Sequence, residues 1–259
     1  MPRKGPKRMT ANAVKEIVRK ELKEELEEKT AVIGVSDATV TTAAIPNGDV
    51  TSSGNVVKLF PSITQGTGQY NDRIGNEIRL KHLDIKMLLN YALPDLSTAT
   101  NEDTALGVRV MILRQKDDNA AAQAIENFQG NKLLENGVGT AGPKQFTGQT
   151  FNLVQKINRE QFSVRYDKVH NIKVNYRQSS GGATAVSQSF FPPTTKVISK
   201  RLTFGKRGLK LTYGDGASEE PSNFPYLLVI GYASTVSSSV PSAGILRYSY
   251  SANAKYTDA

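Results

Sequence analysis

The chain has 259 residues and a formal net charge of +9. It contains no cysteine, which excludes disulfide bonds, thiolate metal sites and a cysteine nucleophile. Only two histidines are present, His82 and His170, so the sequence offers little for a histidine metal site or a Ser-His-Asp triad. The length fits one large domain, and the basic excess suits a polyanionic partner.

The first ten residues carry four cations and no acidic residue. The cations are Arg3, Lys4, Lys7 and Arg8, set among Pro and Gly. Each cation that meets a phosphate releases a counterion, so binding through this segment would depend on salt. We therefore predict that residues 1–10 form a disordered basic tail that contacts nucleic acid. A nuclear import signal or a solubilising terminus has the same composition.

Residues 11–29 have the periodicity of an amphipathic helix. The apolar positions recur at steps of three and four residues and form one narrow stripe: Val14, Ile17, Val18, Leu22 and Leu26. Such a stripe needs a partner, so we expect it to serve oligomerisation by packing on its own subunit or on a neighbouring one. A solvated helix held by ion pairs is the alternative. Residues 30–55, rich in Thr, Ser, Gly, Asn and Asp, resemble an extended linker.

A long strand is predicted after a glycine-rich stretch. Ile78 and Leu80 share one face, but from Leu83 onward the apolar positions change parity. Side chains of a strand alternate with period two, so a change of parity needs an extra residue. We predict a β-bulge near Lys81–His82, in a strand with one apolar face and one partly basic face.

The rest of the chain alternates strands with loops of very uneven length. Strands are expected at 56–60, 106–113, 162–166, 172–176, 196–204, 209–213, 226–232 and 246–256, with a short surface helix at 119–128. Gly205-Lys-Arg-Gly208 is expected to be a tight hairpin with a basic tip. This set predicts an all-β fold, an eight-stranded antiparallel jelly-roll sandwich over residues 56–259, built from two four-stranded sheets.

Basic residues gather on two of these predicted strands. The first carries Arg79, Lys81 and Lys86 opposite its apolar face. The others surround the expected hairpin: Lys196, Lys200, Arg201, Lys206 and Arg207. If both groups open toward one surface, they form a patch that follows a phosphate backbone, with Tyr70 and Tyr213 available to stack on bases. Scattered solvent-facing cations are the alternative. No element reads base edges, so binding is expected to be independent of sequence.

No catalytic, cofactor or metal site is predicted. Residues 137–142 match a dinucleotide-binding glycine pattern, but no strand precedes them and Pro143 follows. The acidic pairs at 117–118 and 219–220 lie in loops, where solvation accounts for them. No apolar run has the length of a transmembrane helix, so no membrane partner is expected. We expect a protein without enzyme activity, cofactor or metal.

Several of these features resemble the capsid proteins of small viruses with circular single-stranded DNA genomes. The resemblance rests on four stretches: Arg73-Ile74-Gly75, the alternating strand from Glu77 to Leu89, the Phe-x-Val-x-x-Asp-Lys run at 162–168, and the Tyr-rich terminal strand at 246–256. It implies copies of one jelly roll that close into a small icosahedral shell, in the simplest arrangement, around single-stranded DNA. The implied locations are the virion and, during assembly, the host nucleus.

Two other functions fit the same residue pattern. One is a capsid protein of a small RNA virus with the same fold. The other is a non-viral jelly-roll binding module such as a lectin. Many capsids of the single-stranded DNA type carry a long Arg-rich arm, whereas the arm here is short and its helix is close to neutral.

Overall fold

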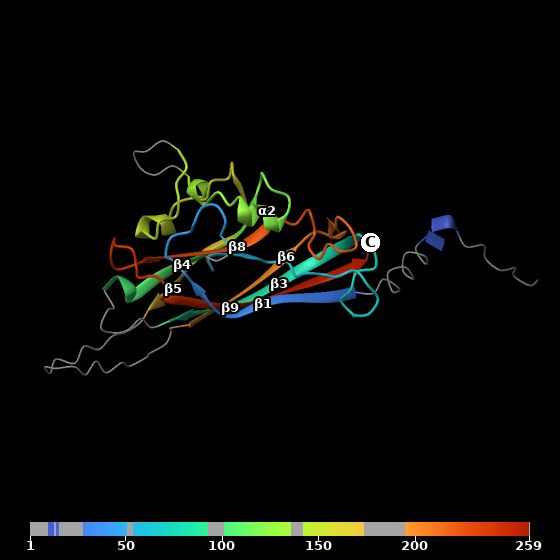
Figure 1. Cartoon of the computed structure of the whole chain (residues 1–259), viewed down its shortest axis with the longest axis horizontal. Helices are drawn as coiled ribbons and strands as arrows, with labels where there is room; N and C mark the ends of the chain where they lie inside the picture. The colour runs from blue at the N-terminus through green and yellow to red at the C-terminus, as the bar shows by residue number, and fades with distance from the viewer. Residues whose placement is uncertain are drawn as a thin grey trace, which may run out of the picture.

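The computed structural model describes residues 10–12, 14–15, 28–50, 54–92, 101–135, 142–173 and 195–258. They form two antiparallel sheets packed face to face, with loops and short helices layered over one of them (Figure 1). The strands are β1 (Glu28–Val40), β2 (Val56–Lys58), β3 (Glu77–Tyr91), β4 (Ala105–Gln115), β5 (Phe162–Lys173), β6 (Thr195–Thr203), β7 (Leu209–Thr212), β8 (Tyr226–Ser234) and β9 (Leu246–Asp258). The short helices are η1 (Asn101–Asp103), α2 (Ala121–Glu126), η2 (Gly130–Lys132) and η3 (Thr150–Leu153).

Strand pairing joins the first half of the chain to the second half. Sheet A has the order β1-β9-β3-β6, with β7 also paired to β3, and sheet B has the order β2-β8-β4-β5. Thus β1 pairs with β9, β2 with β8, β3 with β6 and β7, and β4 with β5, always antiparallel. The chain is a long two-stranded ribbon that has been folded over into two layers. A mostly β fold with antiparallel sheets is therefore confirmed.

The main core lies between the two sheets. It includes Leu83 and Ile85 of β3, Tyr248 of β9, and Val108 and Val110 of β4, all nearly inaccessible to solvent. Full burial of one such side chain contributes about 1.5–3 kcal/mol, so this layer is the main source of stability. The alternate positions of each strand must then point away from it.

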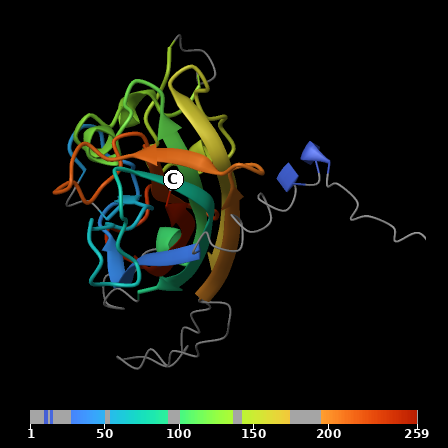
Figure 2. The same ribbon diagram turned by 90° about the vertical axis from the view of Figure 1, so that its right-hand side faces the viewer.

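Sheet B is covered on its other face as well. Met111 and Leu113 of β4 and Val229 of β8 pack under Ile125 of α2 and the neighbouring Phe128. A sheet buried on both faces has nearly continuous apolar strands, which agrees with the apolar runs in β4 and β8. No second apolar cluster of the described residues lies on the outer face of sheet A, which is open (Figure 2).

The predicted β-bulge in β3 is confirmed. The pairing of β3 with β9 shifts register between Leu80 and His82, which leaves Lys81 as the extra residue. Leu80 and Leu83 are both fully buried despite their odd spacing. The extra residue is what keeps the apolar positions on the core side along the whole strand.

The expected hairpin at Gly205–Gly208 is wrong. β6 pairs with His82–Asn90 and β7 pairs with Glu77–Leu80, both antiparallel to the same strand. They therefore run end to end as one interrupted edge strand, and residues 204–208 loop out opposite the bulge. Gly208 has a φ of 73°, and a Cβ there would lie 2.7 Å from the Leu80 carbonyl oxygen, so only glycine fits.

The expected linker over 30–55 is also wrong for its first part. β1 begins at Glu28 and takes residues up to Val40 into sheet A, so the helix predicted to extend to residue 29 ends earlier. Residues 11, 12, 14 and 15 are helical, and Val14 is 46% exposed. The other stripe residues, Ile17, Val18, Leu22 and Leu26, lie outside the described residues. The two short strands expected at 162–166 and 172–176 are one strand, β5.

A buried arginine joins two loops at one end of the sandwich. Arg73 is fully buried, and its Nη1 donates to the Gly75 carbonyl oxygen and to Asn76 Oδ1. Its Nη2 donates to the carbonyl oxygens of Asp215 and Ser218 at 2.7 and 2.8 Å. The loop before β3 is thereby tied to the loop after β7. Hydrogen bonds from a charged donor are stronger than those from a neutral donor, so the Arg73 guanidinium stabilises the contact between the two loops.

Replacing Arg73 with Met should lower the free energy of unfolding by about 3 kcal/mol, because the charge-assisted hydrogen bonds that tie the two loops together are lost. Chemical denaturation followed by tyrosine fluorescence measures the change. The matched control is Arg79→Met on the open face, which should alter stability by less than about 0.5 kcal/mol. If the two variants were equally stable, Arg73 would not hold this end together.

Candidate nucleic-acid interface

The outer face of sheet A gathers the solvent-facing positions of four strands. The pairing registers place Asp84 of β3 beside Arg201 of β6 and Asn253 of β9. Two residues further along β3, Lys86 lies beside Ser199 of β6. Because the alternate residues of these strands fill the core, the side chains on this face point to solvent. Most of them are polar or charged, although Val32, Leu88 and Val197 are exposed here as well.

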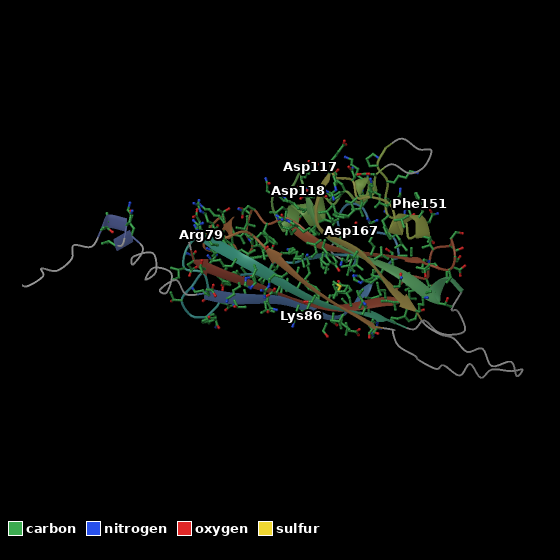
Figure 3. All side chains as sticks on the ribbon, turned by 180° about the vertical axis from the view of Figure 1, so that it is seen from behind. Arg79, Lys86, Asp117, Asp118, Phe151 and Asp167 are labelled. Carbon is green, nitrogen blue, oxygen red and sulfur yellow. The ribbon has the colours of Figure 1, made fainter. Side chains whose placement is uncertain are left out.

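The two outer sides of the sandwich differ in character. Figure 3 shows Arg79 and Lys86 on the strands of sheet A, and Asp117, Asp118 and Phe151 on the opposite layer, over sheet B. The first two are exposed strand residues, whereas the last three belong to loops and a short helix. The cations of β3 thus lie on a bare sheet, away from these acidic loop residues.

A shallow basin of about 600 Å³ lies on the outer face of sheet A. It is lined by Thr30, His82, Asp84, Lys86, Ser199, Arg201, Asn253 and Lys255. Arg201 donates from Nε and Nη2 to the two carboxylate oxygens of Asp84, at 2.5 and 2.8 Å. This contact lowers the pKa of the Asp84 carboxyl and raises the pKa of Arg201, so both stay ionised at neutral pH. His82 Nε2 lies 3.5 Å from the same carboxylate.

Only some of the cations on this side are neutralised by neighbours. The ion pairs are Arg201–Asp84, Lys210–Glu77, Arg247–Asp37 and Lys255–Glu28. Within the described residues, no ion pair is formed by five further cations of the face and its adjoining loop: Arg79, Lys81, Lys86, Lys206 and Arg207. The face therefore keeps an uncompensated positive charge, which suits a polyanion.

The bulge and the loop opposite it bring cations from two distant segments together. Lys81 is the extra residue of β3, and residues 204–208 leave the edge strand at the same level. A Cβ built on Gly208 would lie 3.6 Å from Lys81 Cδ, so the loop and the lysine are close neighbours. Lys206 and Arg207 are exposed at the tip of this loop. The structure thus groups Lys81 with Lys206 and Arg207, and it places Arg79 and Arg201 on the same side.

Lys200 does not lie on this face. It pairs with Ile85, whose side chain is in the core, so Lys200 points to the inner side of β6. Its Nζ lies 5.8 Å from the ring centroid of Tyr166 on β5. The expectation that Lys200 and Arg201 open toward one surface is wrong, because consecutive residues of a strand point to opposite faces.

The two tyrosines expected to stack on bases differ in accessibility. Tyr213 is buried, and the Arg73 guanidinium carbon lies 4.1 Å from its ring centroid, so its ring is already covered. Tyr70 is 65% exposed, and its hydroxyl donates to the Glu28 carbonyl oxygen at 2.8 Å. Of the two, only Tyr70 can offer a free ring face to a base.

The tail cations Arg3, Lys4, Lys7 and Arg8 lie outside the described residues. The point at which the chain enters the sheet is nevertheless defined. Glu28 at the start of β1 pairs with Thr257 of β9, which pairs on its other side with Arg79 of β3. The segment that carries the tail therefore joins sheet A at the end where Arg79 lies.

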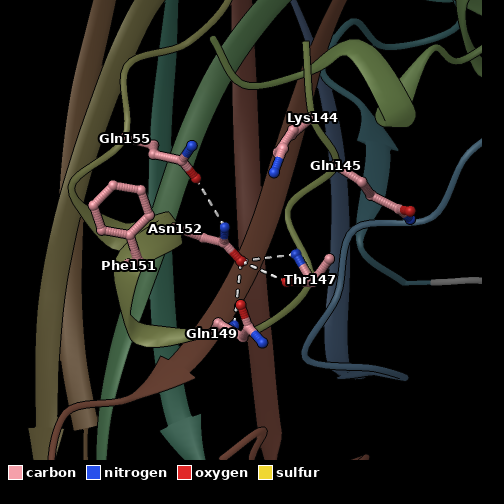
Figure 4. Close-up of a pocket in the computed structure, with 7 residues that line it drawn as sticks. All are labelled: Lys144, Gln145, Thr147, Gln149, Phe151, Asn152 and Gln155. Atoms are coloured by element: carbon pink, nitrogen blue, oxygen red, sulfur yellow. Dashed lines mark hydrogen bonds between the residues drawn. The ribbon is translucent and has the colours of Figure 1, made fainter. Parts of the chain in front are cut away.

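A pocket of about 360 Å³ in the layer over sheet B has a different character (Figure 4). Asn152 Oδ1 accepts hydrogen bonds from the backbone N–H groups of Thr147 and Gln149 and from the Thr147 hydroxyl. Its Nδ2 donates to Gln155 Oε1 at 2.9 Å. The Asn152 amide is thus engaged by its neighbours, and it orders its own loop.

The acid of the Phe-x-Val-x-x-Asp-Lys run has a structural role. Arg109 of β4 is 3% exposed and donates from Nε and Nη2 to both carboxylate oxygens of Asp167, at 2.8 and 2.7 Å. Its Nη1 donates to the Asn152 carbonyl oxygen at 2.6 Å. The lone polar residue in the apolar run of β4 thus anchors the covering loop to sheet B.

Comparison with known proteins identifies no relative of this chain. No model of a known protein family matches it, and no curated protein matches it significantly. In the part of the chain that the structure describes, no helix is long and apolar enough to cross a membrane. Within the same residues, no three His, Asp or Glu side chains converge as candidate metal ligands. The functional argument therefore rests on fold and surface chemistry.

Replacing Asp84 with Asn should strengthen binding of a short oligodeoxythymidine, because Arg201 is released from its ion pair. The plot of log affinity against log salt should steepen by about 0.7, the change expected for one added phosphate contact on a single strand. Fluorescence anisotropy at several salt concentrations measures this. The control is Glu126→Gln on α2, which makes the same change in net charge on the opposite layer and should leave the slope unchanged. Equal steepening in both variants would make net charge the cause and this face irrelevant.

Proposed function

We propose that this protein is a viral capsid protein that self-assembles into a small icosahedral shell and packages single-stranded DNA through contacts that are independent of sequence. The observation that carries the proposal is the asymmetry of the sandwich. One sheet presents an open face with uncompensated cations, whereas the other sheet is covered by a thick layer of loops. A shell subunit needs such a difference between its cargo side and its outer side.

The strand pairing supports a jelly roll. If β6 and β7 are counted as one interrupted strand, each sheet has four strands in the path β1-β9-β3-β6 or β2-β8-β4-β5. Every connection except that between β4 and β5 crosses from one sheet to the other. A ribbon of paired strands rolled in this way is the jelly-roll arrangement that capsid proteins use. The resemblance of the sequence to capsids of single-stranded DNA viruses agrees with it.

The distribution of charge supports the choice of cargo. Lys81, Lys206 and Arg207 lie near the start of β3 on the open face. Arg79 lies at the same end, where the segment that carries the basic tail joins sheet A. Phosphates that meet these cations release counterions, which favours binding without any reading of bases. The face is a sheet surface, and none of the helices or hairpins that the structure describes projects from it to enter a groove. Binding of flexible single strands fits this geometry better than binding of a duplex.

Assembly would use the surfaces other than the open face. The long connection between β4 and β5 forms most of the layer over sheet B, and loops of this size in a compact domain are usually functional. Its exposed Phe151 and Val154 are apolar side chains that neighbouring subunits could bury. The stripe of Val14, Ile17, Val18, Leu22 and Leu26 is a second candidate contact. By the resemblance, assembly takes place in the host nucleus and ends in the virion.

Purification of the full-length protein followed by size-exclusion chromatography and electron microscopy tests the proposal. We expect closed particles of megadalton mass that protect nucleic acid from nuclease, and sequencing of that nucleic acid should show DNA. Protected RNA would favour a capsid of a small RNA virus. A species of one or a few subunits in every buffer would favour a binding module such as a lectin and would refute the capsid function.

Removing charge at the bulge should reduce packaging. In a triple variant Lys81→Gln, Lys206→Gln and Arg207→Gln, the particles should hold less nucleic acid and release it at lower salt, because about three phosphate contacts are lost. The ratio of absorbance at 260 and 280 nm, taken across a salt series, measures this. The control is Lys132→Gln, Lys144→Gln and Lys156→Gln, a matched set of exposed lysines on the layer over sheet B. An equal loss in the control would contradict a role for the open face.

A further inference from the structure

The seam where the two sheets meet edge to edge carries a second group of cations. β5 is the edge strand of sheet B and β6 is the edge strand of sheet A, and the two run along the same side of the sandwich (Figure 2). Lys168 and His170 of β5 pair with Val110 and Val108, which are core residues, so both point to the inner side of their sheet. The same register argument turns the side chains of Lys196 and Lys200 of β6 inward.

One contact between a lysine and an aromatic ring links the two strands across the seam, and a second ring contact lies within β5. Lys200 Nζ lies 5.8 Å from the ring centroid of Tyr166, and the Tyr166 hydroxyl lies 3.1 Å from His170 Nε2. The two rings are stacked with centroids 6.5 Å apart. Burial lowers the pKa of His170, and the ammonium groups of Lys196 and Lys168 lower it further. The imidazole therefore lies in a region of positive potential.

No carboxylate in the described part of the chain compensates this potential. Lys168, Lys196 and Lys200 form no ion pair there. The residue next to Lys168 is Asp167, but it points to the other side of β5 and is held by Arg109. Lys168 and Lys196 are exposed and Lys200 is half-buried, so an anion can reach all three.

We propose that this seam binds phosphate groups of single-stranded nucleic acid, with Lys168, Lys196 and Lys200 as the contacting cations and His170 as a hydrogen-bonding neighbour. The nature of the ligand rests on the proposed function, whereas the need for an anion rests on the seam itself. β6 carries Arg201 on the outer face and Lys200 in the seam. A strand bound to the open face of sheet A can therefore turn over this edge and continue into the seam.

Inward-pointing charges on edge strands have another known use, which is to prevent sheets from pairing edge to edge. That role needs only the charge of the lysines and no bound anion. It therefore predicts that nucleic acid leaves their accessibility unchanged, and this difference makes the proposal testable.

Acetylation of lysines, quantified by mass spectrometry, tests the seam in the full chain whatever its assembly state. The reaction is run with no ligand, with inorganic phosphate and with a short oligodeoxythymidine, and the assembly state is kept the same in all three. The oligonucleotide should reduce acetylation of Lys168, Lys196 and Lys200, while Lys132 and Lys156 of the opposite layer should react as before. Unchanged reactivity of the three seam lysines would overturn the site.

The same measurement separates this inference from the proposed function. Lysines Lys81, Lys86 and Lys206 report on the open face. Protection of these three without protection of the seam would refute the seam and leave the capsid interface standing. Protection of the seam alone would support the seam and count against the open face. Protection by inorganic phosphate but not by the oligonucleotide would overturn nucleic acid as the ligand.

Substitutions provide an independent test. The double variant Lys196→Gln and Lys200→Gln should make the plot of log affinity against log salt shallower by about 1.4, two contacts at about 0.7 each. The double variant Lys196→Arg and Lys200→Arg keeps the charge and should keep the slope. Circular dichroism and thermal unfolding check that each variant folds. The site is refuted if the Gln and Arg double variants give the same slope. If the Gln double variant does not fold, the acetylation pattern of the unaltered protein decides whether the site exists.

Discussion

The C-terminal strand is the element that holds sheet A together. β9 pairs with β1 on one side and with β3 on the other, over most of its length in both cases. Its core positions are Tyr248, Tyr250, Ala252, Ala254 and Tyr256, all of them buried. The hydroxyls of Tyr250 and Tyr256 donate to the carbonyl oxygens of Lys58 and Asn71, so this strand also fixes the loops around β2 and β3. Because β1 and β9 lie near opposite ends of the chain, sheet A cannot close until the last residues are in place, and such long-range pairing is slow.

This pairing scheme also decides which surfaces can carry function. Sheet B is buried on both faces, so its strands are apolar nearly throughout and its covering loops form the surface. Sheet A is buried on one face only, and half of its residues are free to be polar. Among the strands, the charged side chains that face solvent therefore lie mainly on the open face of sheet A and at the edges of the sheets. The cations of the open face lie on the unburied side of sheet A, and the cations of the seam lie on the edge strands β5 and β6.

The sequence predicts the strands of this fold where burial imposes a strict pattern. The parity change between Leu80 and Leu83 located the bulge at Lys81 because a half-buried strand tolerates no slip of register. β1 was missed because it is an edge strand with apolar residues on both faces, and Val32 and Val35 are exposed. Its exposed positions include Gly34 and its buried ones Ala31, so the contrast between its faces is weak. Composition alone cannot distinguish such a strand from a linker.

The candidate site was predicted in part, and the error has a clear physical origin. A Gly-x-x-Gly stretch between two apolar runs indicates a hairpin, unless both runs pair with a third strand, which no local pattern reveals. The sequence could have predicted that Lys200 and Arg201 point to opposite faces, because Lys200 has the same parity as the core residues Ile198 and Leu202. The seam itself could not be predicted, since it depends on which edge of sheet A faces which edge of sheet B.

The edges of the two sheets carry features that oppose strand pairing between copies of the chain. An exposed strand edge can pair with another copy indefinitely, and natural sheets block this with charge, bulges or short strands. β1 has a bulge at which Asp37, with a φ of 53°, accepts a hydrogen bond from Arg247. β5 has a bulge at Arg165. β2 is only three residues long. β6 carries the inward-pointing Lys196 and Lys200, and the loop at residues 204–208 interrupts this edge. With all four edges blocked in these ways, the assembly proposed above would have to use contacts other than edge-to-edge strand pairing.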